Sequence, residues 1–397
     1  MKLSARLGSV LPSPTLALNA KAKALAAKGE DVVGFAAGEP DFDTPQHIKD
    51  AAITALNEGF TKYTATAGIP ELRAAICDKL RGDNGCDFSP EQVLVSCGAK
   101  HALYNIFQAL LQEGDEVIIF SPYWVSYPDM VRLAGGKPVI IHTREENQYA
   151  PDLESIKSAL TSRTRAVIIN SPSNPSGAVL SRQALSVIAE AVREHPCLIV
   201  TDDIYEKLLY QPGPFVNIVN VAPDLKERTV VVNGMSKAYS MTGWRIGYAA
   251  GPKPLIAGMQ IVQDQSTSNP NSIAQKAAVA ALRGPPETLQ SMVKEFRERR
   301  DIFVSGLNAL NGVKCRSPEG AFYLFPNVQA LYDRRYKGIQ IKDSVRLSEI
   351  LLNDFKLAAV PGAPFGSDAN LRLSFATSRA VIEKGLARLR DFVGSLN

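Results

Sequence analysis

The sequence predicts an α/β protein, with a large domain built on a mainly parallel seven-stranded sheet between helices and a smaller α+β domain. The first observation is that short apolar, β-branched runs alternate with helical stretches from about residue 46 to residue 285. Such alternation is typical of a parallel sheet covered by helices on both faces. The predicted strands are Gln92–Ser96, Glu116–Phe120, Pro138–His142, Ala166–Asn170, Cys197–Thr201, Thr229–Asn233 and Ile246–Ala250.

The second observation is a change of rhythm after residue 285. The stretch Pro285–Leu310 has apolar residues at helical spacing, which predicts a long amphipathic helix that stops near Gly312. Strand segments at Gly320–Pro326 and Leu371–Ala376 then flank helical patterns, as in a small α+β domain. The expected division is a large domain of residues 46–285 and a small domain of residues 286–397 with the N-terminal segment 1–45.

Composition favours small-molecule chemistry. The 397 residues carry a formal net charge of only +4, and basic and acidic residues are interspersed, so neither a nucleic-acid nor a membrane partner is expected. Proline at positions 12 and 14 interrupts any signal-peptide core, and no apolar run nears the roughly 20 residues that span a bilayer. Five cysteines without a C-x-x-C pair fit a reduced, cytoplasmic protein, and the four histidines show no metal-ligand spacing.

The residues that follow the predicted strands indicate where a ligand binds, because ligands of open α/β sheets lie beyond the carboxyl ends of the strands. Cys97-Gly98-Ala99-Lys100 leads from a strand into a helix and offers free N–H groups to an anion, although an ordinary turn is the more common reading. Asn174 lies before a proline in a stiff loop that follows another strand, and its amide could equally belong to a rigid surface turn.

Two charged residues follow later strands. Asp202 ends an apolar run and would raise the pKa of a cationic partner, but a helix N-cap is an equal alternative. Lys237 follows Gly234-Met235-Ser236, and a lysine among small residues at a strand end can become a neutral amine that condenses with an aldehyde. Most lysines are instead solvated surface groups. No Walker A or G-x-G-x-x-G loop favours a nucleotide.

Together these segments resemble the class I aminotransferases of fold type I, in particular the bacterial aspartate and prephenate aminotransferase subgroup. The most specific block is Ser236-Lys237-Ala238-Tyr239-Ser240-Met241-Thr242-Gly243-Trp244-Arg245-Ile246-Gly247-Tyr248, which is similar to the family's pyridoxal-lysine signature. Other matching blocks are Gly38–Pro45, Lys62-Tyr63, Gly68–Arg73, Ser121–Trp124 and Arg372–Ser378. The resemblance extends from about residue 5 to residue 395.

The resemblance implies a pyridoxal 5′-phosphate (PLP) site. Lys237 would bind the cofactor covalently and Arg245 would hold its phosphate, with Ser236 in the same signature. The backbone amides of Gly98 and Ala99 would also contact the phosphate, beside Lys100. Tyr63 would reach the phosphate from a neighbouring subunit, so the resemblance implies a homodimer with shared sites.

Further roles are implied for the cofactor ring and the substrate. Trp124 would stack on the ring, Asn174 and Tyr205 would bond its hydroxyl oxygen, and Asp202 would pair with its nitrogen. Departures from the family pattern are Ser176 in place of threonine and Gly-Ala in place of Gly-Gly in the phosphate loop. The substrate-binding residues implied by the resemblance are Arg372 and Gly38 for the α-carboxylate, Lys100 and Thr15 for a distal carboxylate, and Trp124 and Asn174.

We therefore expect amino transfer between aspartate or glutamate and 2-oxo acids, with prephenate as a further acceptor, by a ping-pong mechanism in which Lys237 moves the α-proton. A different amino-acid specificity, such as aromatic or alanine, and a PLP-dependent lyase on the same fold remain alternatives. Related domains also serve as cofactor sensors in transcription regulators behind a helix-turn-helix domain. Because the family pattern starts within the first dozen residues here, we expect the enzyme.

Overall fold

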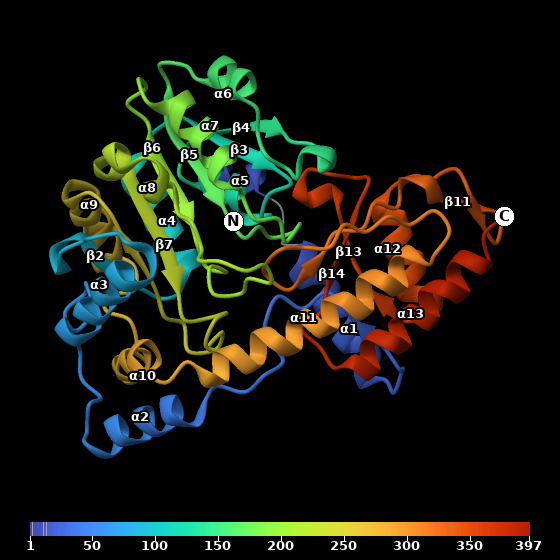
Figure 1. Ribbon diagram of the computed structural model, residues 1–397, viewed down its shortest axis with the longest axis horizontal. Helices are drawn as coiled ribbons and strands as arrows, with labels where there is room; N and C mark the ends of the chain where they lie inside the picture. The colour runs from blue at the N-terminus through green and yellow to red at the C-terminus, as the bar shows by residue number, and fades with distance from the viewer. Residues whose placement is uncertain (2, 11, 13) are drawn as a thin grey trace.

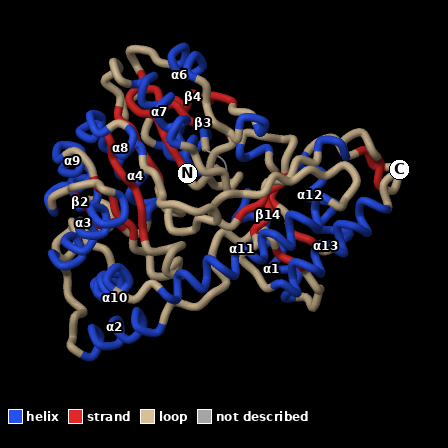
Figure 2. The backbone as a smooth tube through the Cα atoms, viewed as in Figure 1, coloured by secondary structure: helices blue, strands red, loops and turns tan. Residues whose placement is uncertain are grey.

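The computed structural model of the protein describes residues 1, 3–10, 12 and 14–397, and of residues 5 and 14–16 it describes the backbone alone. The chain forms a large body that contains the main sheet and a smaller body at the C-terminal end (Figure 1). The long helix α11 (Glu287–Asn308) runs from one body to the other. The backbone trace shows most of the strand segments gathered inside the large body (Figure 2).

The large body is built around a seven-stranded sheet with strand order β2-β8-β7-β6-β5-β3-β4. Strand β8 is antiparallel to both of its neighbours, and all other adjacent pairs are parallel, which confirms the predicted fold class. The strands are β2 (Val93–Ser96), β3 (Glu116–Ser121), β4 (Lys137–His142), β5 (Thr164–Asn170), β6 (Leu198–Asp202), β7 (Thr229–Gly234) and β8 (Gly247–Ala250). Each agrees with a predicted strand to within two residues at either end.

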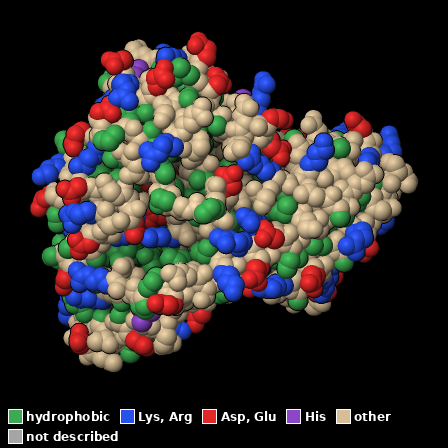
Figure 3. Space-filling model, in the orientation of Figure 1, with side chains coloured by type: hydrophobic (Ala, Val, Ile, Leu, Met, Phe, Trp, Pro, Cys, Tyr) green, Lys and Arg blue, Asp and Glu red, His purple; other side chains and the backbone are tan. Residues whose placement is uncertain are grey.

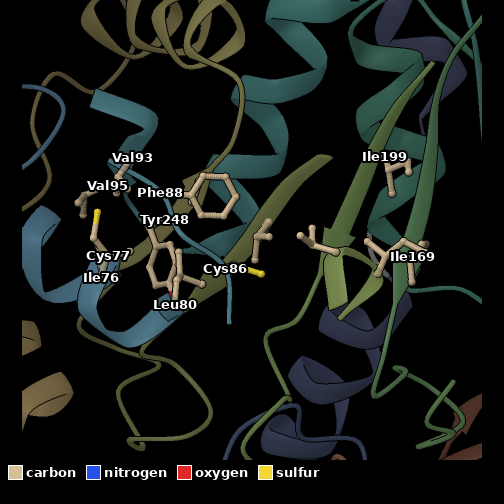
Figure 4. Close-up of a cluster of buried hydrophobic side chains, with 14 of the residues drawn as sticks. Ile76, Cys77, Leu80, Cys86, Phe88, Val93, Val95, Ile169, Ile199 and Tyr248 are labelled. Carbon is tan, nitrogen blue, oxygen red and sulfur yellow. The ribbon is translucent and has the colours of Figure 1, made fainter. Parts of the chain in front are cut away.

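Helices bury both faces of this sheet. Along β5, Val167 and Ile169 belong to one apolar cluster and Ala166 and Ile168 to another, as the two-residue period of a strand requires. Figure 4 shows part of the first cluster, in which side chains from α3 pack against β2 and β8. The helices of this body are α2 (Gln46–Asn57), α3 (Pro70–Asn84), α4 (Ala99–Leu110), α5 (Ser126–Leu133), α6 (Leu153–Ala159), α7 (Arg182–Val192), α8 (Ile218–Val221), α9 (Lys253–Asp264) and α10 (Ser272–Arg283).

The smaller body combines helices with short strands. Its three-stranded antiparallel sheet has the order β13-β14-β9, and β1 near the N-terminus pairs with β12, which ties the first forty residues to this body. Its elements are α1 (Pro14–Ala27), β1 (Val33–Gly34), β9 (Tyr323–Leu324), β10 (Arg335–Tyr336), β11 (Ile339–Gln340), α12 (Ser344–Phe355), β12 (Leu357–Ala358), β13 (Val360–Pro361), β14 (Leu371–Ser374) and α13 (Arg379–Gly394). Short 3₁₀ turns at Ala5–Ser9, Pro90–Gln92, Glu145–Asn147, Pro223–Arg228, Gln329–Leu331 and Ala363–Phe365 complete the described elements.

The long helix predicted over Pro285–Leu310 is confirmed by α11 to within two residues at each end, and Gly312, which has a φ of 87°, lies in the turn beyond it. One local prediction for this body was inaccurate. The strand expected over Gly320–Pro326 is reduced to the two residues of β9. Its first half instead forms a bridge to the large body, because the Ala321 N–H donates to the Leu208 carbonyl and Ala321 has a φ of 57°.

The domain boundaries at residues 45/46 and 285/286 stay a prediction.

In the described part of the chain, the helices are all too short or too polar to cross a bilayer. On the face shown in Figure 3, basic and acidic side chains are interspersed rather than gathered by sign.

Candidate active site

A cavity of about 290 Å³ opens where the carboxyl ends of the central strands face the smaller body. Strands β5 and β6, the turn after β7, the start of α4 and strand β14 all contribute side chains to it. Most of the residues selected from the sequence line this one cavity: Gly38, Ala99, Lys100, Trp124, Asn174, Asp202, Tyr205, Ser236, Lys237, Arg245 and Arg372.

Lys237 lies in the turn that follows β7, with its side chain half-buried. Its Nζ donates a hydrogen bond to the Gly38 carbonyl and lies 5.9 Å from the centre of the Tyr205 ring. Burial lowers the pKa of Lys237 to about 8, and the negative charge of Glu39 offsets part of that effect. The neutral fraction of this amine near physiological pH is therefore far larger than that of an ordinary lysine, and the neutral form is the one that attacks a carbonyl.

Asp202 is the last residue of β6 and is only 4% exposed. Burial raises the pKa of its carboxyl to about 6, while hydrogen bonds limit the rise. The Tyr127 hydroxyl donates to Oδ2 at 2.6 Å, and the Ile204 N–H donates to Oδ1 at 3.3 Å. A buried, oriented carboxylate of this kind favours a cationic partner in the cavity.

One end of the cavity is suited to a phosphate. Gly98 precedes α4 with a φ of 92°, and a Cβ at this position would lie 2.3 Å from the guanidinium of Arg245. The N–H groups of Ala99 and Lys100 begin the first turn of α4 and lie at its positive end, whereas His101 and Ala102 already donate to the Gly98 carbonyl. The exposed Arg245 donates to the carbonyls of Thr242 at 2.8 Å and Cys97 at 3.2 Å, which orients its guanidinium beside this turn.

The other end carries a buried arginine. Arg372 on β14 is 2% exposed and donates to the Asn174 side-chain oxygen and the Ala36 carbonyl, each at 3.0 Å. Its guanidinium lies 4.6 Å from the Tyr323 ring centre and 5.1 Å from that of Phe365. Its Nε–H is buried and has no partner among the described residues. A buried cation with an unused donor is a site for a carboxylate.

The wall between these ends is aromatic. The half-buried ring of Trp124 has the Nζ of Lys100 4.7 Å from its centre, and it packs edge-on against Tyr127. The Tyr205 hydroxyl shares a 2.8 Å hydrogen bond with that of Tyr323. These flat surfaces and phenolic groups suit an aromatic ligand that carries polar substituents.

Tyr63 and Gly98 are predicted site residues that are not among the residues lining this cavity, although Gly98 directly precedes the lining residue Ala99. Tyr63 is 92% exposed, in a loop of the same chain that does not contribute to the cavity. Thr15 lies in the first turn of α1, and its side chain falls outside the described part of the structure.

Sequence reasoning missed three residues that shape the site. Tyr127 holds Asp202, and its position three residues after Trp124 at the start of α5 is a helical spacing that could have identified it. Asn170 bridges two selected residues, since it donates to the Asp202 carbonyl and accepts from the Asn174 N–H, each at 2.9 Å. Tyr323 meets the site only through the pairing of β9 with β14, which no local pattern reveals.

These groups fit the demands of PLP, which is an aromatic aldehyde with a phosphate and a basic ring nitrogen. The amine of Lys237 matches the aldehyde, and the carboxylate of Asp202 matches the ring nitrogen. The cradle of Gly98 and Arg245 matches the phosphate. In the described part of the chain, no cluster of three His, Cys, Asp or Glu side chains forms a candidate metal site.

Fold and site thus define a PLP-dependent enzyme whose cavity contains a buried arginine with an unused donor. The family model "Aminotransferase class I and II" matches residues 30–389, and the chain belongs to this family of PLP-dependent aminotransferases.

Relatives match over nearly the whole chain. An aspartate aminotransferase of Bacillus subtilis is 49% identical, with 99% of both chains covered. An aspartate/prephenate aminotransferase of Nitrosomonas europaea is 48% identical, with 99% of this chain and 100% of the relative covered. The solved aspartate aminotransferase of Thermus thermophilus with maleate superposes with a TM-score of 0.93 at 45% identity, covering 98% of this chain and 99% of the other.

Proposed function

We propose that this aminotransferase moves the amino group between aspartate or glutamate and 2-oxo acids, with oxaloacetate, 2-oxoglutarate and prephenate as acceptors. The observation that carries the proposal is the arrangement within one cavity of a neutral-prone lysine amine, a buried acid and a buried arginine with a free donor.

The residues at the cavity suggest how the cofactor is held. When bound, PLP supplies an electrophilic aldehyde and a ring that accepts electrons from the α-carbon of the substrate. Asp202 would face the ring nitrogen, and its carboxylate favours the protonated form of that nitrogen. The remaining contacts would be a Trp124 stack, hydrogen bonds from Asn174 and Tyr205 to the ring hydroxyl oxygen, and phosphate contacts from Gly98, Ala99, Lys100, Ser236 and Arg245.

Lys237 would be the catalytic residue. Among the described residues, two lysines line the cavity, Lys100 and Lys237. The amine of Lys100 lies against Trp124, whereas that of Lys237 lies near Asp202 and Tyr205. With a pKa of about 8, this amine can take the α-proton of the amino acid and return it, which makes it both general base and general acid. Two such half-reactions with different acids give ping-pong kinetics.

Substrate selection would come from cations at two positions. Arg372 would hold the α-carboxylate through its free Nε–H and one Nη–H, and the Gly38 backbone would add a contact. Lys100 and Thr15 would hold a distal carboxylate. Support for dicarboxylic substrates comes from the aspartate and aspartate/prephenate aminotransferases named above and from the solved relative with maleate, itself a dicarboxylate.

We also propose a homodimer in the cytoplasm. Tyr63 is almost fully exposed and does not line the active-site cavity of its own chain, which suits a residue that completes the phosphate site of a second copy. The five cysteines are all free, as a reducing compartment favours. The domain division at residues 45/46 and 285/286 completes the proposal.

The test is an assay of the purified holoenzyme with aspartate, glutamate, alanine and phenylalanine against a panel of 2-oxo acids that includes prephenate. Aspartate and glutamate should have the highest kcat/KM. Product that forms over many turnovers without any 2-oxo acid acceptor would support a lyase instead, and a preference for alanine or phenylalanine would contradict the proposed specificity.

A variant sharpens this test. Lys100→Ala should lower kcat/KM about tenfold for aspartate but leave alanine nearly unchanged, because only aspartate carries a second carboxylate. Lys137→Ala, at an exposed lysine on β4 outside the cavity, is the matched control. If Lys100→Ala impaired alanine and spared aspartate, the assignment of this lysine would be wrong.

A further inference from the structure

The loop that carries Lys237 and Arg245, residues 236–245, is fixed by a second segment that is distant in sequence, residues 38–44. We call these the cofactor loop and the N-terminal segment. The side chains of Thr44 and Glu39 bond the loop at three points, and Lys237 itself donates to the Gly38 carbonyl. Neither Thr44 nor its partner Trp244 lines the cavity, so their contacts act on the loop and not on a ligand.

Both hydrogen-bonding functions of the Thr44 hydroxyl are directed at the cofactor loop. The hydroxyl is in a side chain that is 7% exposed, it donates to the Ser240 carbonyl at 2.7 Å, and it accepts from the Trp244 indole N–H at 3.0 Å. Each bond satisfies a group that would otherwise be left without a partner at a part-buried position. One hydroxyl thus joins two points of the loop that are four residues apart.

These two points border the residues whose backbone is least common. Ser240 has a φ of 52° and Arg245 a φ of 57°. Both residues therefore adopt the left-handed backbone conformation that is uncommon for residues other than glycine. Such conformations persist where surrounding contacts fix them. Thr44 is hydrogen-bonded to the carbonyl of Ser240 and to the side chain of Trp244, which directly precedes Arg245. It is therefore well placed to fix the backbone of Ser240 and Arg245.

A second contact supports the same loop. Thr242 donates its hydroxyl proton to Glu39 Oε2 at 2.8 Å, and its carbonyl accepts from Arg245 Nη1 at 2.8 Å. The N-terminal segment is itself anchored to α11, because Asp41 pairs with Arg299 at 2.7 Å. The loop therefore rests on a segment that is held independently of any ligand.

We propose that Thr44 and Trp244 are positioning residues that hold the cofactor loop in the geometry that binds PLP. The inference goes beyond the proposed substrate specificity and rests only on the role of the loop in holding the cofactor. It assigns a purpose to the threonine of the Gly38–Pro45 block and to the tryptophan of the lysine signature.

The test is the dissociation constant of PLP from Thr44→Val, which keeps the shape of the side chain and removes the hydroxyl. We expect affinity to fall about tenfold, since two partners lose a hydrogen bond. Thr44→Ser should restore most of the affinity because it restores the hydroxyl. Thr229→Val, which removes a buried hydroxyl bond to the Leu225 carbonyl at the opposite end of β7, should affect stability and leave PLP affinity unchanged.

Trp244→Phe provides an independent arm, which also decides the matter if Thr44→Val does not fold. It removes the indole donor and should weaken PLP binding several-fold, and the double variant should bind no more weakly than Thr44→Val alone, because the two residues share one hydrogen bond. Thermal unfolding of the apoenzymes is measured in parallel. Wild-type affinity in Thr44→Val or Trp244→Phe, or a Thr44→Ser variant as weak as Thr44→Val, would overturn the proposal. Failure of the wild-type protein to bind PLP would contradict the cofactor assignment and this inference with it.

Discussion

The two arginines at the ends of the cavity are held in opposite ways. Arg372 is 2% exposed, lies against two aromatic rings and is bonded to the large body through Asn174. Arg245 is exposed, has a left-handed backbone and donates only to carbonyls of nearby loops. The first is fixed by its burial, whereas the second depends on the loop that carries it.

This difference indicates a division of labour. A desolvated guanidinium interacts more strongly with an anion and discriminates its geometry, as recognition of a substrate that arrives and leaves in each cycle requires. The exposed arginine works together with the N-terminus of α4, so the phosphate has several donors and no single one dominates. Substitutions at the two ends should therefore have separable effects.

The largest effect is expected at the buried end. Arg372→Lys should lower kcat/KM for aspartate about 100-fold, since a charge-assisted hydrogen bond contributes up to about 3 kcal/mol and lysine cannot form the bidentate pair. The affinity for PLP should be unchanged. Steady-state kinetics and a PLP titration of the same preparation check both parts, and equal losses in the two measurements would refute the division between the ends.

A smaller effect, of the opposite kind, is expected at the exposed end. Arg245→Lys should weaken PLP binding about tenfold, because an exposed charge is screened by solvent and the helix N-terminus still contacts the phosphate. With saturating PLP, the KM for aspartate should remain at the wild-type value. Equilibrium dialysis measures the first quantity, and a raised KM under saturation would show that the two ends are coupled.

The acid between the two ends offers a third comparison. The Tyr127 hydroxyl donates to Asp202, and this hydrogen bond lowers the pKa of the carboxyl. Because Tyr127→Phe removes the hydroxyl, the pKa of Asp202 should rise above about 6. The acidic limb of the pH profile of kcat/KM should then move to higher pH. Tyr123→Phe, four residues earlier and without a bond to Asp202, is the control, and an unmoved limb in Tyr127→Phe would contradict the role of the hydroxyl.

A last prediction is a pH dependence that needs no variant. Burial lowers the pKa of Lys237 to about 8, so the neutral, reactive fraction of its amine increases as the pH rises towards that value. The rate of PLP attachment to the apoenzyme should rise about tenfold per pH unit below pH 7 and level off above pH 8. Stopped-flow absorbance checks this, and a rate still rising at pH 10 would indicate an amine with an ordinary pKa.

The sequence predicted the large body better than the small one, for a physical reason. Strands of a sheet that is buried on both faces are continuous apolar runs, and the polar residues at their carboxyl ends, such as Asp202 and Asn174, stand out against them. The strands of the small body have two to four residues, and Ala321 leaves the predicted strand to bond the other body. Tyr323 was missed because its contacts with the site arise only from tertiary packing.

The central claim is that the amine of Lys237 is the one that joins PLP in this cavity, between the two arginines. Borohydride reduction of the holoenzyme followed by proteolysis and mass spectrometry of the modified peptide tests it most directly. The account predicts a phosphopyridoxyl group on Lys237 at a stoichiometry of about one per chain. A label on Lys100 or another lysine, or no covalent label on a protein that retains aminotransferase activity, would contradict it.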